Sequence, residues 1–427
     1  MEKSVKKRDK VLILMMLCWL VYSCSYLGKV NYSANINSIM SFYNVDKAAA
    51  GLVGTFFFFA YGAGQILNGL LCNKFNLKWM IFISLAVSGM VNLIIAITTS
   101  FAIIKYLWLI NGVSLSILWP SLIRLLAENV PKKDMPKASV IMGTTVATGT
   151  LIIYGLSALF TYLNVFKLAF YTAGIILPLV GVVWICTSSK LIKQIREEYI
   201  EDDINVENDK TKDKANKNSN LSGRLILLSI CVMAIFAVST NLIKDGLTTW
   251  VPTILKDTYS LPDSISIILT LSLPMVAIFA NSFAVKVHKK ITDFVFQCVL
   301  MFSISSLIIV CVIMGLSLNQ FVITVIGFTL VCFLVSSCNS VITSIFPLFM
   351  KGKINSGLIA GLLNGFCYLG STISSYGLGT IAKTFGWNAV FWVLFGACIL
   401  VCVVGIIYTV IKKISTKINA KADKGAE

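Results

Sequence analysis

Two lysines lie inside long apolar stretches of the sequence, where a positive charge is costly unless it faces protein or water. Lys29 is in the middle of an apolar run over residues 11–42, and Lys244 lies in another apolar run about half of the 427-residue chain later. The nearest end of the first run is about ten residues from Lys29, or ~15 Å along a helix, so snorkelling to a membrane surface is the less favoured alternative. The pair predicts a cationic site for a small anion, and structural ion pairs are the other alternative.

Polar side chains in the same kind of apolar run are candidates for contacts with the rest of such an anion. Tyr22, Tyr26 and Lys29 are spaced four and three apart, so they would share one face of a continuous helix. The further candidates are Tyr61, Gln65, Asn241, Asn364 and Tyr368. Buried hydroxyls and amides need partners, so we expect each of these groups to bind either substrate oxygens or a neighbouring helix.

Three more charged residues accompany the two lysines. Asp245 directly follows Lys244, and because adjacent helix residues point about 100° apart the two side chains need not pair. Asp245 is predicted to tune the site or to bind a coupling proton, or else only to balance charge against a neighbouring helix. Two nearby ammonium groups would keep it ionised, which argues against easy protonation. Arg124 and Glu128, four residues apart near the end of a span, predict a helix-end pair that also acts as a gate.

The composition indicates a protein that crosses a membrane many times. Hydrophobic residues make up 57% of the chain and charged residues 13%, whereas soluble domains carry about 25% charge. The net charge of +17 comes from lysines in short loops and tails, so it does not indicate nucleic-acid binding. The twelve cysteines are scattered singly and His288 is the one histidine, so we expect no metal site, no cofactor and no enzyme. The first apolar run is too long for a cleaved signal peptide, so we expect it to be kept as a span.

Twelve apolar segments are long enough to cross the hydrocarbon layer. They cover residues 11–42, 48–72, 78–98, 101–129, 137–162, 166–188, 224–253, 263–286, 291–315, 319–349, 354–383 and 387–411. Most loop lysines follow even-numbered spans, which predicts that these loops, both termini and residues 189–223 lie on the cytoplasmic side of the cell membrane.

The order of the spans predicts two six-helix halves with a polar linker between them. The N-terminal half would take residues 1–188, the cytoplasmic linker 189–223, and the C-terminal half with a cytoplasmic tail 224–427. Glycines recur in the fifth and eleventh spans, as Gly143, Gly149 and Gly155 and as Gly361, Gly365 and Gly370. Small residues allow helices to approach closely, so these two spans are predicted to correspond in two parallel, pseudo-symmetric halves.

Four motifs resemble a known family. They are Tyr22-x3-Tyr26-x2-Lys29-x-Asn31 in the first span, Asn111-Gly112 with Trp119-Pro120-x3-Arg124 in the fourth, Lys244-x-Gly246-x3-Trp250-x-Pro252-x2-Leu255 in the seventh, and Gly361 through Tyr368-Leu369-Gly370 followed by Phe385-Gly386-Trp387 in the eleventh and the loop after it. Together they resemble the organophosphate:phosphate antiporters of the major facilitator superfamily, which include glycerol-3-phosphate and hexose-6-phosphate transporters. The resemblance extends over nearly all twelve spans.

The chain departs from this family at several functional positions. Both family arginines are lysines here, at 29 and 244, and a family lysine on the second helix corresponds to Gln65. A seventh-helix tyrosine of the family corresponds to Asn241, and the fifth-helix histidine aligns near Val146. The aspartate of the loop after the second span is replaced by Asn73.

The resemblance implies an all-α membrane protein that transports a small organic anion by alternating access. The expected cargo is a sugar phosphate or glycerol phosphate exchanged for inorganic phosphate, by a protein that is monomeric in the bilayer. Lys29 and Lys244 would hold the anionic group, and the resemblance favours Tyr26, Tyr61 and Tyr368 as further ligands. An H⁺- or Na⁺-coupled symporter of a carboxylate such as a sugar acid is one alternative. A transporter-like receptor that senses a sugar phosphate is another.

Overall fold

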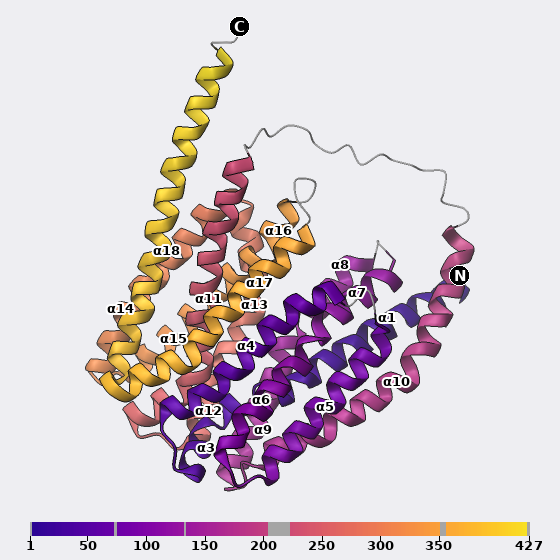
Figure 1. Cartoon of the computed structure of the whole chain (residues 1–427), viewed down its shortest axis with the longest axis horizontal. Helices are drawn as coiled ribbons and strands as arrows, with labels where there is room; N and C mark the ends of the chain where they lie inside the picture. Colours follow the sequence, from indigo (N-terminus) through magenta and orange to yellow (C-terminus); the bar gives the residue numbers. More distant parts are fainter. Residues whose placement is uncertain (1, 72–74, 132–133, 204–222, 351–355, 425–427) are drawn as a thin grey trace. The chain divides into compact units, whose positions relative to one another are not determined.

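The computed structural model describes residues 2–71, 75–131, 134–203, 223–350 and 356–424, and every regular element in these ranges is helical (Figure 1). The N-terminal elements are α1 (Glu2–Ser25), η1 (Tyr26–Gly28), α2 (Asn31–Ala34), α3 (Ile36–Tyr43), α4 (Lys47–Leu71), α5 (Leu77–Ile97), α6 (Phe101–Ser116), α7 (Leu118–Asn129), α8 (Met135–Gly143), α9 (Thr145–Tyr162) and α10 (Leu168–Asp203). The later elements are α11 (Gly223–Tyr259), α12 (Asp263–Thr270), α13 (Ser272–His288), α14 (Phe294–Ser317), α15 (Phe321–Ser340), η3 (Val341–Ile345), α16 (Phe346–Phe349), α17 (Ser356–Ile373), η4 (Ser374–Leu378) and α18 (Gly379–Lys424).

Eleven helical stretches within the described ranges are long and apolar enough to cross a membrane, and the last of them holds two spans. This stretch, Ile359–Ile414, has 56 residues, and Gly386 inside it adopts a φ of 80° that divides it into two helices. Large apolar side chains such as Phe59, Met90 and Leu307 are exposed, as expected for faces in contact with lipid. The predicted all-α fold with twelve spans is therefore confirmed.

The first span is not the continuous helix that the sequence predicts. α1 ends at Ser25, a short 3₁₀ turn (η1) follows, and the chain resumes helical structure only at Asn31. The side-chain amide of Asn111 donates a 2.7 Å hydrogen bond to the carbonyl oxygen of Gly28. Because another helix supplies this donor, a backbone carbonyl at the break is bonded inside the apolar layer. Tyr22, Tyr26 and Lys29 therefore do not share one regular helix face.

Two glycines allow close helix contacts at corresponding places in the chain. A Cβ atom at Gly149, in the fifth span, would collide with the backbone carbonyl oxygen of Ser23 in α1. A Cβ atom at Gly370, in the eleventh span, would collide with the backbone carbonyl oxygen of Val238 in α11. In both cases the contacted residue, Ser23 or Val238, lies six positions before a half-buried lysine, Lys29 or Lys244. These contacts support the predicted correspondence of the fifth and eleventh spans.

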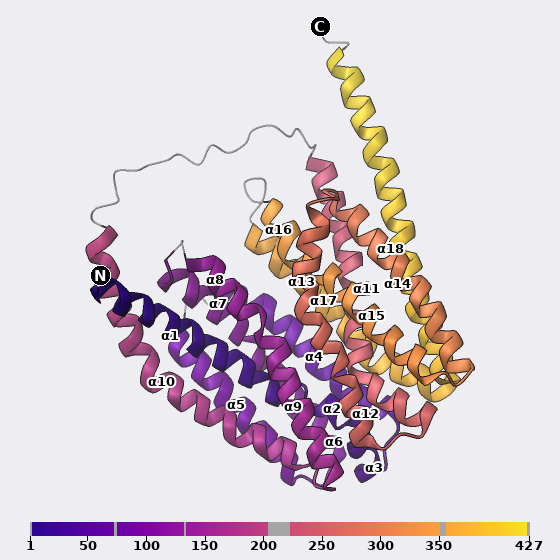
Figure 2. The ribbon, with the colours of Figure 1, turned by 180° about the vertical axis from the view of Figure 1, so that it is seen from behind.

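The helices form two compact units. Unit 1 comprises Met1–Lys214 together with Val251–Ile278, and unit 2 comprises Ala215–Trp250 together with Phe279–Glu427. In unit 1, α10 packs along α5 and α4 packs along α6 (Figures 1 and 2). In unit 2, α14 packs between α15 and α18. The predicted halves, with their boundary at 189–223, stay a prediction.

A polar cluster in unit 1 binds the C-terminal end of α11 and the start of α12. The side chain of Asn37 donates to the carbonyl oxygen of Pro252 at 3.2 Å and to Asp263 Oδ1 at 3.1 Å, and it accepts a 2.7 Å hydrogen bond from Thr253 Oγ1. Lys256 Nζ lies 3.1 Å from Asp263 Oδ2. We call these five residues the Asn37 cluster. Through it, the segment after Trp250 is bonded to residues of unit 1, which the sequence did not predict.

Candidate functional site

Lys29 lies against tyrosine rings in unit 1. Its Nζ atom is 3.9 Å from the ring centroid of Tyr61 and 5.0 Å from that of Tyr26. An ammonium over an aromatic face is attracted by the electron density of the ring, by about 0.5–2 kcal/mol. Such a contact stabilises the cation without adding a negative charge. The positive charge of Lys29 is therefore not cancelled by these two neighbours.

Further aromatic side chains fix the two tyrosine rings. Tyr61 is 1% exposed and stacks on Phe57 at a centroid distance of 5.7 Å. Tyr22 contacts Tyr26 at 5.6 Å and Trp119 at 4.8 Å. The structure thus brings three of the predicted tyrosines together with Lys29. Gln65 lies one turn beyond Tyr61 on α4 and is also buried.

Buried amides hold the backbone on either side of Lys29. Asn31 Nδ2 donates to Asn92 Oδ1 at 2.8 Å, and Ser88 Oγ donates to Asn111 Oδ1 at 2.6 Å. Asn35 Nδ2 continues this network to the carbonyl oxygen of Asn31 at 2.8 Å. The motif comparison included Asn31 and Asn111, but sequence reasoning missed Asn92. The only signal for Asn92 was an amide inside an apolar span, and such a signal does not identify the partner.

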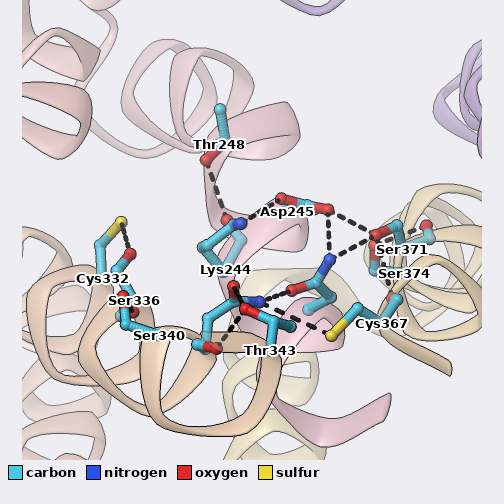
Figure 3. Close-up of polar contacts among 12 residues, drawn as sticks. Lys244, Asp245, Thr248, Cys332, Ser336, Ser340, Thr343, Cys367, Ser371 and Ser374 are labelled. Carbon is cyan, nitrogen blue, oxygen red and sulfur yellow. Dashed lines mark hydrogen bonds and ion pairs between the residues drawn. The ribbon is translucent and has the colours of Figure 1, made fainter. Parts of the chain in front are cut away.

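Lys244 lies beside a carboxylate in unit 2 (Figure 3). Its Nζ atom is 3.6 Å from Asp245 Oδ1, although the two residues are adjacent on α11. This separation is longer than the 2.7–2.9 Å of a charge-assisted hydrogen bond, so the two charges attract without a short bond. The side chain of Lys244 is 30% exposed and that of Asp245 is 17% exposed, so the ammonium is the more accessible of the two.

Neighbouring helices hold the Asp245 carboxylate in place (Figure 3). Ser371 Oγ, on α17, donates a short hydrogen bond to Asp245 Oδ2, and Asn241 Nδ2 donates to the same oxygen at 3.2 Å. Asn339 Nδ2, on α15, donates to Asn241 Oδ1 at 2.7 Å. The carboxylate is therefore connected to α15 and α17 as well as to its own helix. Sequence reasoning missed Ser371 and Asn339, because a serine or an asparagine inside an apolar span does not by itself identify its partner.

The predicted ligands Asn364 and Tyr368 lie on α17. They precede Ser371 by seven and three residues, so the three residues share one face of this helix. Both are partly exposed. Asn241, by contrast, is 3% exposed, and its amide bonds Asp245, Ser371 and Asn339. Its contacts indicate that it positions the carboxylate.

The Arg124–Glu128 pair lies at the end of α7. Arg124 Nε is 2.6 Å from Glu128 Oε1, and their side chains are 30% and 37% exposed. The pair lines a cavity of ≈ 540 Å³ in unit 1 together with Lys78, Ser189 and Lys193. The predicted ion pair is thus present, and its gating role stays a prediction. No group of three or more His, Cys, Asp or Glu side chains suited to a metal ion occurs among the described residues.

One ion pair joins Asp293, directly before α14, to Lys412, near the end of the last membrane-spanning stretch. Lys412 Nζ is 2.6 Å from Asp293 Oδ2, and Asp293 also accepts hydrogen bonds from the backbone N–H groups of Val295 and Phe296. Burial alone would raise the pKa of Asp293. The hydrogen bond from Lys412 and those from the backbone outweigh it, so the pKa lies below its ordinary value.

Comparison with known proteins gives relatives of two kinds. The chain is 23% identical over 99 residues to the membrane sensor protein UhpC of Escherichia coli, covering 23% of each chain. It is 22% identical over 189 residues to a probable hexose phosphate transport protein of Chlamydia pneumoniae, covering 43% of this chain and 41% of that protein. The matched regions therefore span less than half of these relatives, and they agree with the resemblance to organophosphate:phosphate antiporters.

Solved structures show the same fold. A bacterial homologue of the human lysosomal transporter Spinster, in an inward-facing and occupied conformation, superposes with a TM-score of 0.71 at 12% identity, covering 94% of this chain and 96% of that one. The xylose transporter XylE from E. coli, in a partially occluded inward-open conformation, gives a TM-score of 0.69 at 9% identity, covering 92% of this chain and 97% of that one. The family model of the Major Facilitator Superfamily matches residues 18–375. With twelve spans and this match over most of its length, the chain belongs to the Major Facilitator Superfamily.

Proposed function

We propose that this protein is a secondary active transporter that carries a phosphorylated metabolite across the cell membrane in exchange for inorganic phosphate. Lys29 and Lys244 each contribute positive charge to binding of the phosphate group. Alternating access moves one six-helix half against the other, and no covalent chemistry by the protein is required. The protein works as a monomer, with both termini and residues 189–223 in the cytoplasm.

The observation that carries this proposal is the setting of Lys29. A lysine is costly inside a membrane span, and such residues commonly mark the path of a substrate or an ion. The faces of Tyr61 and Tyr26 attract the ammonium without adding a negative charge, which suits a group that binds an anion. A phosphate ester supplies negative charge and several acceptor oxygens for such a group.

The other predicted ligands orient the organic part of the substrate. Hydroxyl groups of Tyr26 and Tyr61 are attached to rings that already contact Lys29, so they lie near the bound phosphate. Asn364 and Tyr368 present polar groups on the α17 face that carries Ser371. Gln65 supplies an amide one turn from Tyr61, where the family has a lysine.

A counterflow experiment in liposomes tests the proposed function. Purified protein in vesicles preloaded with inorganic phosphate should take up glucose 6-phosphate or glycerol 3-phosphate, and uptake should stop when internal phosphate is omitted. Uptake of glucuronate driven by a H⁺ or Na⁺ gradient would instead establish the carboxylate symporter. The carboxylate of Asp245 beside Lys244 is the observation that favours this second candidate.

A receptor is the candidate from a different class. The similarity to a membrane sensor protein favours it, because that relative is described as a sensor. A receptor would bind glucose 6-phosphate without moving it. Saturable binding with no counterflow of any tested anion would support the receptor and contradict the transporter.

A further inference from the structure

The carboxylate of Asp245 is fixed next to the cation of the proposed site. Ser371 and Asn241 both donate hydrogen bonds to Oδ2, and Oδ1 faces Lys244 Nζ at 3.6 Å (Figure 3). Asn339 holds the Asn241 amide in turn. With its second oxygen bonded by two other side chains, the carboxylate cannot rotate away from Lys244 without breaking those bonds.

A fixed negative charge beside a binding cation acts on any anion that the cation binds. Coulomb repulsion between Asp245 and the ligand grows in proportion to the charge of the ligand. A doubly charged anion is therefore repelled twice as strongly as a singly charged anion of the same shape. Lys244 attracts both kinds, and Asp245 reduces the advantage that the second charge would otherwise give.

We propose that Asp245 is a specificity-determining residue that shifts the site toward singly charged anions. This inference rests on the proposed function, because it requires that Lys244 binds the substrate anion. In this role Asp245 does more than balance the charge of Lys244, because it makes the site discriminate between ligands that differ only in charge. Ser371, Asn241 and Asn339 are positioning residues that keep Asp245 close to Lys244.

Sulfate and phosphate esters of one alcohol provide a matched pair of probes. Glucose 6-sulfate carries one negative charge, whereas glucose 6-phosphate, with a second pKa of about 6, carries nearly two at about pH 7.5. Glycerol 3-sulfate and glycerol 3-phosphate form a second pair. The dissociation constants of all four are measured on the full-length protein, for the ordinary chain and for Asp245→Asn.

Removal of the carboxylate charge should tighten binding of both esters, but unequally. If the sulfate ester gains about ten-fold, the phosphate ester should gain about a hundred-fold, because the repulsion energy doubles with the charge. Equal gains for the two esters, or no gain, would overturn the proposal. A purely structural role of Asp245 would alter the unfolding temperature but not the phosphate-to-sulfate ratio.

Two further variants complete the test. Asp293→Asn removes the same charge from a different ion pair of unit 2 and should leave the ratio unchanged. Ser371→Ala keeps the charge of Asp245 but removes one of the hydrogen bonds that hold the carboxylate. It should raise the phosphate-to-sulfate affinity ratio by about two- to three-fold, and it decides the question if Asp245→Asn does not fold.

If the ordinary protein binds none of the four esters, the proposed function fails and this inference fails with it. If it binds them and the ratio stays fixed in the variants, only this inference fails.

Discussion

Lys29 and Lys244 stand in the first and seventh spans, each six residues after a close contact with a glycine of a neighbouring helix, but their surroundings differ in charge. Lys29 lies on the faces of Tyr61 and Tyr26, whereas Lys244 lies 3.6 Å from the carboxylate of Asp245. The tyrosine rings stabilise a cation without adding a negative charge, whereas the carboxylate of Asp245 places one beside Lys244. We therefore expect the two lysines of this pseudo-symmetric fold to attract an anion with unequal strength.

Substitution of each lysine by alanine tests whether the two lysines attract the anion unequally. We expect these substitutions to have the largest effect on binding affinity. Lys29→Ala should weaken binding of glucose 6-phosphate by about ten- to hundred-fold, the worth of one charge-assisted hydrogen bond of about 1.5–3 kcal/mol. Removing Lys244 together with its neighbouring carboxylate, as Lys244→Ala/Asp245→Asn, should cost less, since Asp245 repels the anion that Lys244 attracts. Binding measured by isothermal titration calorimetry on detergent-solubilised protein gives both values.

The double variant provides the control for these single changes. Both lysines are proposed to act on one ligand, so their effects should not add fully. Unchanged affinity in both single variants, at normal levels in the membrane, would remove the lysines from the site. A larger loss for Lys244→Ala/Asp245→Asn than for Lys29→Ala would reverse the comparison.

The aromatic setting of Lys29 is tested at Tyr61. Tyr61→Phe keeps a ring under the ammonium and should lower the unfolding temperature less than Tyr61→Leu, which removes the ring and should cost about 1–2 kcal/mol or more, with weaker anion binding. Thermal unfolding of the two purified variants measures the difference. Equal stability of the two variants would show that the ring face contributes nothing to Lys29.

Arginine at each lysine separates the two settings by geometry. In Lys29→Arg, the planar guanidinium can stack on the tyrosine faces, so substrate affinity should stay within about three-fold. In Lys244→Arg, the guanidinium fork can bind Asp245 through two parallel hydrogen bonds, which should weaken anion binding by about ten-fold. Counterflow and binding assays on both variants provide the readout. Equal substrate affinity of Lys244→Arg and Lys29→Arg would contradict the proposed difference between the surroundings of the two lysines.

The Asp293–Lys412 pair gives the smallest effect and a reference for an ordinary ion pair. The pKa of Asp293 is lower in the folded protein than in the unfolded chain. The ion pair therefore adds its full share to the free energy of unfolding at pH values above the unfolded pKa. This share is lost as the pH falls through the folded pKa. Both side chains are 38% exposed, so solvent screening limits the contribution to about 1 kcal/mol or less. Unfolding temperatures measured as pH is lowered toward about 3 should fall more for the ordinary protein than for Asp293→Asn. Parallel curves would show that the pair adds no measurable stability.

The sequence predicted the helical class, the number of spans and the residues around Lys29. The length of each apolar segment, and the polar residues within it, can be read directly from the sequence. It did not predict the break after Ser25, since the donor that permits it, Asn111, comes from another helix. It also did not predict the approach of Lys244 to Asp245. The angle of 100° between adjacent residues of an ideal helix describes only where the side chains begin. It does not include the flexible four-carbon chain of lysine, or the hydrogen bonds from Ser371 and Asn241 that fix the carboxylate.

The glycine contact and the Asn37 cluster give the two parts of α11 different mechanical properties. Near Val238, the helix fits against Gly370 by shape, and water cannot replace a contact of this kind. Beyond Trp250, the helix is attached through buried hydrogen bonds between Asn37 and Thr253 or Pro252, which depend on donor and acceptor positions. One part of α11 is therefore held by close steric fit and the other by hydrogen bonds, so a change of side-chain volume would disturb the first and a change of polarity the second.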